Sequence, residues 1–377
     1  MNKLILNVSL LAIAACTILP SCKREYRLFA GSYTSENAEK GLSVINFNSS
    51  NGSLRRVSST DAGPAPSYFC VSKKNSLFYV INEVMEFSGN AGGGLTTLKY
   101  NNKNLSFEKL NEMVIPNGGP CYISMSPDSA YLFVANYPEG SVVVVSLDAN
   151  GIPERVTDTL LFDKEEPGDS HAHMILSDPE GKHVYLTDLG LNRITVFDFD
   201  GKTGKLEPLP DGIVQLPAGT GPRHFVFNDR GTKLYLINEV GSSVMAFDVG
   251  DDGRLKLIST LPTIDEKFNE RNACADIHLG KNGRFLYGSN RGENTIVTYK
   301  VAEDGTLSFA GRSSCGGEWP RNFTLDPSGR FLLAANQKSG NITVFRIDKK
   351  TGLPSQAVDS IRIPQPVCLK FAGYDAE

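Results

Sequence analysis

Arginines, glutamates and histidines occupy equivalent points of a pattern that recurs along this sequence, and these residue types can do chemistry together. Seven of them stand out: His171, His173, Arg223, Glu239, Arg291, Arg321 and Glu83. Arginine binds carboxylate and phosphate groups through paired hydrogen bonds. Histidine and glutamate can remove a proton from water when their pKa lies near the working pH. The combination indicates a site that binds an anionic ligand and performs acid–base chemistry.

The spacing of Arg223 and Glu239 suggests how such residues meet. Both lie in GPRHFVFNDRGTKLYLINE (221–239), where two apolar segments flank a turn at Gly231. In a β-hairpin, residues equally far from the turn lie at the same end. We therefore expect Arg223 and Glu239 side by side on the face opposite the turn. An ion pair that merely closes the hairpin is the alternative to a binding site.

The same hairpin pattern recurs at intervals of 46 to 54 residues. Each unit has an apolar run, a turn rich in Asp, Pro, Asn or Gly, and a second run ending on Asn or Asp plus one more residue. A third run follows, as in SVVVVSLD (141–148). Short strands at this period are typical of a β-propeller with four-stranded blades, because one such unit cannot bury its own apolar face. A parallel α/β fold is disfavoured, since no strongly amphipathic helical stretch connects the strands.

The two ends of the chain complete the count of repeats. VCLKFAG (367–373) is an isolated first strand, whereas RLFAGSY (27–33) and LSVINF (42–47) are a second and a third strand. Joined in space, they form one more blade. The sequence therefore predicts an all-β, seven-bladed β-propeller whose ring is closed by strands from both termini, as a single domain over residues 22–377.

In a ring of such hairpins, first-strand starts and second-strand ends form one rim around the channel. The strand ends are Glu83, Tyr137, Leu189, Glu239, Arg291, Gln337 and Tyr33. A structural device would repeat from blade to blade, whereas these residues vary, as is typical of a ligand site. We assign substrate-binding roles to three residues on this rim, Arg321, Glu83 and Gln337. We assign the same role to His224 and Asp276, which lie next to the rim within first strands.

Three segments resemble the seven-bladed propeller lactonases, which include bacterial 6-phosphogluconolactonases and fungal carboxy-muconate lactonising enzymes. They are GTGPRHFVFNDRGTKLYLINE (219–239), HAHMILSDPEGKHVYLTDLG (171–190) and SNRG (289–292). The resemblance covers essentially the whole chain after the N-terminal segment. It implies catalytic roles for Arg223, Glu239, Arg291 and one of His171 and His173, with Arg321, in WPRNF (319–323), contributing to substrate binding.

The resemblance also implies hydrolysis of a sugar-acid lactone, with a small anionic sugar lactone as the ligand. In that reaction the arginines stabilise the oxyanion, and Glu239 or a histidine is the general base. Two alternatives stay open: a non-catalytic surface propeller that binds a carbohydrate or a protein, and a muconate-type cycloisomerase. We expect no cofactor; a divalent cation at the channel mouth, held by Glu83 and Glu239, is disfavoured by the three arginines on the same rim.

The N-terminal segment predicts export. Lys3 precedes an apolar stretch (4–19), and the sequence Leu-Pro-Ser-Cys follows at residues 19–22. This ending resembles a bacterial lipobox, so we expect residues 1–21 to be a signal peptide and Cys22 to be lipidated. The mature protein would be exported and held at a membrane, on the periplasmic side or the cell surface, by its lipid alone. An ordinary cleaved signal peptide or an uncleaved anchor is the alternative.

Charge and composition exclude some other functions. The formal net charge of −4 provides no basic face for nucleic acid. The five cysteines that follow Cys22 in the sequence are an odd number and widely spaced, which predicts buried thiols rather than a disulfide framework. The glycine-rich segment GNAGGG (89–94) is not followed by a helix whose N-terminus could bind phosphate, so we expect it to be a flexible insertion between strands. His183 and His278 are expected to be ordinary structural residues.

Overall fold

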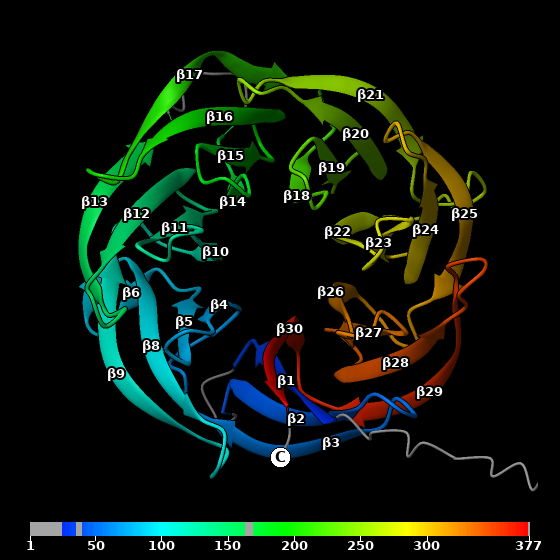
Figure 1. Cartoon of the computed structure of the whole chain (residues 1–377), viewed down its shortest axis with the longest axis horizontal. Helices are drawn as coiled ribbons and strands as arrows, with labels where there is room; N and C mark the ends of the chain where they lie inside the picture. The colour runs from blue at the N-terminus through cyan, green and yellow to red at the C-terminus, as the bar shows by residue number, and fades with distance from the viewer. Residues whose placement is uncertain (1–24, 35–39, 163–168, 376–377) are drawn as a thin grey trace, which may run out of the picture.

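The computed structural model describes residues 25–34, 40–162 and 169–375, and these form a ring of seven four-stranded antiparallel sheets around a central axis (Figure 1). The prediction of an all-β, seven-bladed propeller is confirmed. Residues 1–21 and Cys22 lie outside the described residues, so the signal peptide, the lipidation site and the domain boundary between them stay predictions. Among the described residues, no helix is long and apolar enough to cross a membrane.

We number the blades from the sheet that begins with the first strand after residue 60. The innermost strands of blades 1 to 7 line the channel (Figure 1) and are β4 (Tyr68–Ser72), β10 (Pro120–Met125), β14 (Ala172–Ser177), β18 (Pro222–Phe227), β22 (Ala273–Leu279), β26 (Pro320–Leu325) and β30 (Pro366–Asp375). The second strands are β5 (Leu77–Asn82), β11 (Tyr131–Asn136), β15 (His183–Asp188), β19 (Lys233–Asn238), β23 (Phe285–Arg291), β27 (Phe331–Asn336) and β1 (Glu25–Ser32).

The outer half of each blade consists of a third and a fourth strand. The third strands are β8 (Gly93–Asn101), β12 (Ser141–Leu147), β16 (Arg193–Asp200), β20 (Ser243–Val249), β24 (Thr295–Val301), β28 (Asn341–Ile347) and β2 (Leu42–Asn48). The outermost strands are β9 (Ser106–Ile115), β13 (Pro153–Leu161), β17 (Lys205–Gln215), β21 (Leu255–Pro262), β25 (Leu307–Ser314), β29 (Pro354–Arg362) and β3 (Leu54–Thr60).

Blade 7 closes the ring, as expected, with strands from both ends of the chain. Its strand order is β3-β2-β1-β30, and β30 pairs antiparallel with β1, with Phe29 opposite Lys370. In Figure 1 the last strand, in red, lies beside the first, in blue. This pairing covers the edge of β1 that the N-terminal strands alone would leave open.

The second strands are buried on both faces. All six residues of β5 and of β11 are buried, whereas most residues of the outermost strand β17 are exposed. The reason is that neighbouring blades pack face to face, so only the outermost strands have a solvated side. The resulting core holds the inner hairpins, and with them the channel residues, in fixed positions.

Tyrosines on second strands tie each of three blades to the next. The hydroxyl groups of Tyr79, Tyr185 and Tyr287 donate hydrogen bonds to the carbonyls of Gly151, Gly253 and Gly352, at 2.6, 2.8 and 2.9 Å. These glycines adopt φ angles of 83°, 79° and 78°, a region that favours glycine over other residues. The bonds fix the spacing between blades on the face opposite the predicted site.

Two smaller expectations have different outcomes. The five cysteines of the described residues are buried and free, which confirms their interpretation as buried thiols. The glycine-rich segment, expected as a flexible insertion, instead belongs to a hairpin of β6 (Glu86–Phe87) and β7 (Asn90–Ala91) and to the start of β8. A Cβ atom on Gly94 would lie 2.4 Å from the Phe87 ring, so packing requires glycine there.

Candidate functional site

The hairpin geometry brings the predicted residues to one end of the channel. Pro222 pairs with Asn238, so Arg223 and Glu239 lie side by side at the end opposite their turn. A small cavity at this end, the channel mouth, receives residues from five blades: Ser67, Tyr68, Glu83, Cys121, Arg223, His224, Arg321, Asn322 and Val367. Three of the predicted substrate-binding residues and one predicted catalytic arginine therefore line the same space.

Two arginines converge on one carboxylate oxygen. Arg223 Nε lies 2.9 Å and Arg291 Nη2 lies 2.6 Å from Glu239 Oε2. Arg223 Nη1 also donates to the carbonyl of Ala275, and Arg291 Nε donates to that of Ala273 at 3.0 Å. Because Arg291 comes from the next blade, the Arg223–Glu239 pair does more than close its own hairpin. We call these three side chains the arginine–glutamate cluster.

The arginine–glutamate cluster is charged at neutral pH. Burial alone would raise the pKa of Glu239, but the charges of Arg291 and Arg223 outweigh it and hold this pKa below its usual value. Burial, assisted by the Arg223 charge, lowers the pKa of Arg291 to about 10, which keeps its guanidinium protonated. An ionised carboxylate with a lowered pKa and two cationic partners is a weak base, so Glu239 is better suited to orient the arginines than to activate water.

His173 is buried beside this cluster in an unusual state. Its side chain is on β14, it is 4% exposed, and its Nδ1 is buried without a hydrogen-bond partner among the described residues. Its ring makes edge contacts with those of His224 and Tyr137, at centroid distances of 5.1 and 5.5 Å. Burial, together with the Arg223 charge, holds the pKa of His173 well below its usual value. The imidazole is therefore neutral near pH 7, with an unused nitrogen.

His171 lies closer to solvent, on the other side of Tyr137. The two rings are stacked, with centroids 4.5 Å apart and an interplanar angle of 6°. His171 Nδ1 lies 3.1 Å from the carbonyl oxygen of Tyr137, which can only accept a hydrogen bond. In the neutral ring the proton is therefore on Nδ1, and Nε2 presents a lone pair. Both predicted histidines thus pack against the Tyr137 ring.

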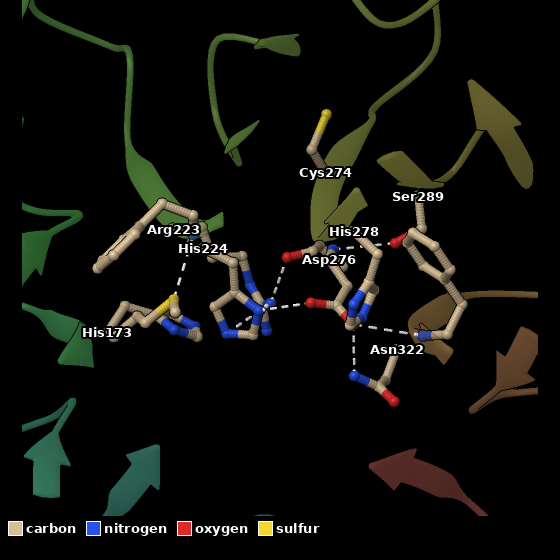
Figure 2. Close-up of polar contacts among 12 residues, drawn as sticks. His173, Arg223, His224, Cys274, Asp276, His278, Ser289 and Asn322 are labelled. Atoms are coloured by element: carbon tan, nitrogen blue, oxygen red, sulfur yellow. Dashed lines mark hydrogen bonds and ion pairs between the residues drawn. The ribbon is translucent and has the colours of Figure 1, made fainter. Parts of the chain in front are cut away.

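A second polar network is centred on Asp276 (Figure 2). Asp276 Oδ1 lies 2.8 Å from His224 Nδ1, and Asp276 Oδ2 lies 3.0 Å from His278 Nε2 and 2.5 Å from Asn322 Nδ2. Burial would raise the pKa of Asp276, but its contacts with His278 and His224 hold it well below its usual value. Figure 2 shows Asp276 between His224 on one side and His278 and Asn322 on the other.

This network also contacts the arginine–glutamate cluster, through a hydrogen bond between His224 and Arg223. Burial, with the Arg223 charge, lowers the pKa of His224 to about 4, so the ring is neutral. With its Nδ1 proton directed to Asp276, His224 Nε2 accepts from Arg223 Nη1 at 3.3 Å. His224 and Asp276, predicted as substrate-binding residues, therefore form the floor of the mouth: His224 lines the cavity, and Asp276 orients it.

The remaining predicted residues lie across the mouth from the histidines. Arg321 is on β26, and its guanidinium lies 5.3 Å above the Tyr33 ring. Glu83 follows β5, and its Oε2 accepts a hydrogen bond of 2.9 Å from the Tyr33 hydroxyl. Gln337 follows β27, and its Oε1 is buried without a partner among the described residues.

Sequence reasoning missed several residues of the site. Tyr33 appears in the rim list, but nothing in its own repeat indicates that it contacts both Arg321 and Glu83. His278 was expected to be ordinary, yet it contacts the central carboxylate of the floor. Asn322 follows Arg321 directly and stands at the strand position that His224 and Asp276 hold in other blades. This shared strand position is the feature of the sequence from which Asn322 could have been predicted as a site residue.

Among the described residues, no group of three or more His, Cys, Asp and Glu side chains is arranged to hold a metal ion. Glu83 and Glu239, the carboxylates considered for a cation, each have a different partner: the Tyr33 hydroxyl for Glu83 and the two arginines for Glu239. The expectation about cofactors stays a prediction.

Comparison with known families and proteins agrees with the fold and the resemblance. Residues 27–371 match the family model described as "Lactonase, 7-bladed beta-propeller". A 6-phosphogluconolactonase of Bacillus subtilis is 28% identical over 353 residues, which are 92% of this chain and 98% of the relative. A protein of the same name from Formosa agariphila is 31% identical over 345 residues, or 88% and 96% of the two chains.

Among solved structures, a periplasmic gluconolactonase of Pseudomonas aeruginosa is similar over nearly its whole length. It aligns with a TM-score of 0.85 at 31% identity, and the alignment covers 92% of this chain and 99% of the relative.

Proposed function

The chain belongs to the seven-bladed β-propeller lactonase family, and we propose that it hydrolyses the lactone of a sugar acid at the channel mouth. One observation carries the proposal: two guanidinium groups meet at one oxygen of Glu239, beside a buried histidine with an unused nitrogen. The names of two relatives, a 6-phosphogluconolactonase and a periplasmic gluconolactonase, support the substrate class.

In the proposed mechanism, the arginines stabilise negative charge on the lactone. Arg223 uses Nε and Nη1, and Arg291 uses Nε and Nη2, for the contacts described above. Each guanidinium thus keeps one terminal amino group, Nη2 of Arg223 and Nη1 of Arg291, that can donate to the carbonyl oxygen of a bound lactone. Donors fixed before the substrate arrives stabilise the developing oxyanion without a cost of reorganisation.

We assign the activation of water to His173 Nδ1. A water molecule hydrogen-bonded to this nitrogen gives up its proton to it as the oxygen attacks the carbonyl carbon. The ring C–O bond then breaks, and the proton passes from His173 to the departing alkoxide, which leaves an open-chain sugar acid. The neighbouring arginine charges make His173 a weak base in the free protein, but the forming oxyanion offsets these charges and favours protonation of the imidazole.

Assays of lactone hydrolysis test this proposal directly. Acid release from δ-gluconolactone and 6-phosphogluconolactone is measured after subtraction of spontaneous hydrolysis, for the wild type and for Arg223→Lys, His173→Ala and His171→Ala. We expect Arg223→Lys and His173→Ala to lower kcat/KM by about 10²- to 10³-fold, as loss of a preorganised donor or a general base does. His171→Ala should lower it less than about tenfold.

Arg230→Ala provides the control, because Arg230 is exposed in the turn at the far end of the same hairpin. It should retain wild-type activity. If the wild type fails to accelerate either lactone, or if Arg223→Lys and His173→Ala match it, the assignment is wrong. A larger loss in His171→Ala than in His173→Ala would move the base to His171.

We further propose that the mature chain is exported and anchored by lipid on Cys22. The support is the N-terminal sequence and the location named for one relative, the periplasmic gluconolactonase. Expression in a bacterial host fed radioactive palmitate should label the wild type in the membrane fraction. Cys22→Ser should lose both the label and the membrane association, and an unlabelled wild type would contradict the anchor.

A further inference from the structure

The half of the channel mouth that faces away from the arginine–glutamate cluster has its own set of polar groups. They come from blades 6, 7 and 1: Arg321 on β26, Tyr33 after β1, and Ser67 and Glu83 on either side of the β4–β5 hairpin. Ser67, Glu83 and Arg321 line the same cavity as Arg223. Arg223 of the cluster and these groups therefore face one common space.

Tyr33 keeps the two charged side chains of this half apart. Its ring lies beneath the Arg321 guanidinium, at 5.3 Å from the centroid, and its hydroxyl donates to Glu83 Oε2 at 2.9 Å. Burial raises the pKa of Tyr33, so the hydroxyl stays protonated and the bond to Glu83 persists at neutral pH. No ion pair between Arg321 and Glu83 forms in the described part of the chain, although both face the cavity.

The groups on this side have unused hydrogen-bonding capacity. In the described structure Arg321 contacts the Tyr33 ring but has no hydrogen bond or ion pair through its guanidinium. The Ser67 hydroxyl, in a residue that is 3% exposed, is buried without a partner. Glu83 receives the Tyr33 hydroxyl on Oε2, which leaves Oε1 to accept. An orphaned buried hydroxyl beside a carboxylate and a guanidinium indicates a site built for a polar ligand.

We propose that Glu83, Arg321 and Ser67 form a subsite for the hydroxyl groups of the lactone's tail, and that Glu83 selects against a phosphorylated tail. This inference rests on the proposed function. A sugar hydroxyl both donates and accepts, so neighbouring hydroxyls can donate to Glu83 and accept from Arg321 at the same time. The substrate class that fits is an uncharged, polyhydroxylated lactone.

A phosphate group fits this subsite poorly. Phosphate oxygens accept hydrogen bonds but do not donate when ionised, so they compete with Glu83 for the same donors and are repelled by its charge. Among the described residues that line this half of the cavity, Arg321 is the one cation that can offset that repulsion, since Lys370 lies over the Tyr68 ring and does not line the cavity. The arginines of the opposite wall already share Glu239.

The ratio of two specificity constants tests the role of Glu83. We expect the wild type to have a kcat/KM at least about tenfold higher for δ-gluconolactone than for 6-phosphogluconolactone. Glu83→Gln should reduce this preference at least about tenfold, by raising the value for the phosphorylated substrate and lowering that for the other. Tyr33→Phe, which frees Glu83 but keeps the ring under Arg321, should raise KM for δ-gluconolactone and leave its kcat nearly unchanged.

Glu318→Gln is the matched control, because Glu318 is exposed on the loop before β26 and takes no part in the cavity. It should leave both constants and their ratio unchanged. A wild type that prefers the phosphorylated lactone would overturn the proposal. So would a ratio unaltered in Glu83→Gln when Tyr33→Phe also has no effect on KM.

Binding measurements separate this inference from the proposed function. If the wild type hydrolyses neither lactone, the proposed function fails, and the subsite is judged by calorimetric titration with gluconate and 6-phosphogluconate. Tighter binding of gluconate by the wild type, with a preference that shrinks in Glu83→Gln, would still support the subsite. Equal affinities in the wild type, or a preference that Glu83→Gln leaves intact, would overturn it.

Discussion

Two neighbouring positions at the end of each second strand behave in opposite ways. The first holds Asn or Asp in six blades: Asn82, Asn136, Asp188, Asn238, Asn290 and Asn336, all of them at most 1% exposed. The next position holds a different residue nearly every time, as in Glu83, Tyr137, Leu189 and Glu239. We call the two sets the constant ring and the variable ring.

The constant ring ties one blade to the segment that arrives from the blade before it. Asn82, Asn290 and Asn336 donate from Nδ2 to the carbonyls of Ala62, Thr263 and Cys315, at 2.8, 3.0 and 3.0 Å. Asn136 does the same to Pro116 at 3.1 Å. Each of these four bonds satisfies a backbone carbonyl where the chain crosses between sheets.

Several side chains of the variable ring contact other side chains of the candidate site. Glu239 and Arg291 belong to the arginine–glutamate cluster, Glu83 faces the cavity, and Tyr137 separates the two histidines. A single step along the chain thus separates a residue that the fold demands from one that it leaves free. This difference implies that substitutions in the two rings affect different properties of the protein.

The largest effect is expected from Glu239→Gln in the variable ring. The amide keeps the size of the side chain but removes the charge that holds Arg223 and Arg291 in position, so the two cations repel each other. We expect kcat/KM for a lactone to fall by about 10²- to 10³-fold. Circular dichroism spectra should stay native at the assay temperature. A variant that is folded and fully active would remove the variable ring from the proposed site.

The second prediction concerns pH and the floor of the mouth. His224 has a pKa of about 4 in the folded chain, against about 6.5 for an unfolded histidine. Below pH 6.5 the unfolded chain therefore binds a proton that the folded chain does not. His224 costs no stability above pH 6.5, and its cost grows to about 3 kcal/mol as the pH falls to 4. His173, whose pKa is also lowered, acts in the same direction.

Thermal unfolding measured between pH 7.5 and 4.5 checks this expectation. The Tm of the wild type should fall as the pH drops, and His224→Gln should show a shallower fall, even if its Tm at pH 7.5 is lower. Parallel curves for the two proteins would mean that folding does not lower the pKa of His224. The comparison of the two rings then predicts that the buried histidines of the site lower the free energy of unfolding at acidic pH, whereas the asparagines of the constant ring do not.

The third prediction concerns the constant ring itself. Asn336→Ala removes the donor to the Cys315 carbonyl, in a blade that contributes neither the histidines nor the arginine–glutamate cluster. We expect the free energy of unfolding to fall by about 1–3 kcal/mol, as for a buried carbonyl left unpaired. At a temperature well below Tm, kcat/KM should stay within about threefold of the wild type. A large loss of activity with an unchanged Tm would contradict the division between the rings.

The sequence predicted what local geometry determines. Hairpin arithmetic placed Arg223 beside Glu239, and the repeat placed Arg291 and both histidines on the same rim. The sequence did not predict the contacts between blades. Tyr33 meets Glu83 and Arg321 because two ends of the chain close the ring, and Asp276 meets His224 across 52 residues. Such contacts depend on how sheets pack side by side, which no periodicity in one repeat encodes.

The smallest effects are expected at Gln337, the variable-ring residue that follows Asn336. Its Oε1 is buried without a partner in the described structure, which costs stability unless a ligand supplies a donor. Gln337→Met should therefore raise the free energy of unfolding by up to about 1 kcal/mol, because it replaces an unsatisfied amide with an apolar chain of similar length. If the amide binds substrate, KM should rise a few-fold in the same variant.

Stability and affinity would then move in opposite directions at Gln337, whereas in Asn336→Ala stability falls alone. Denaturant unfolding and KM measured on both variants would decide whether the two rings differ in this way. A Gln337→Met protein that is less stable, with unchanged KM, would place Gln337 among the residues that the fold requires.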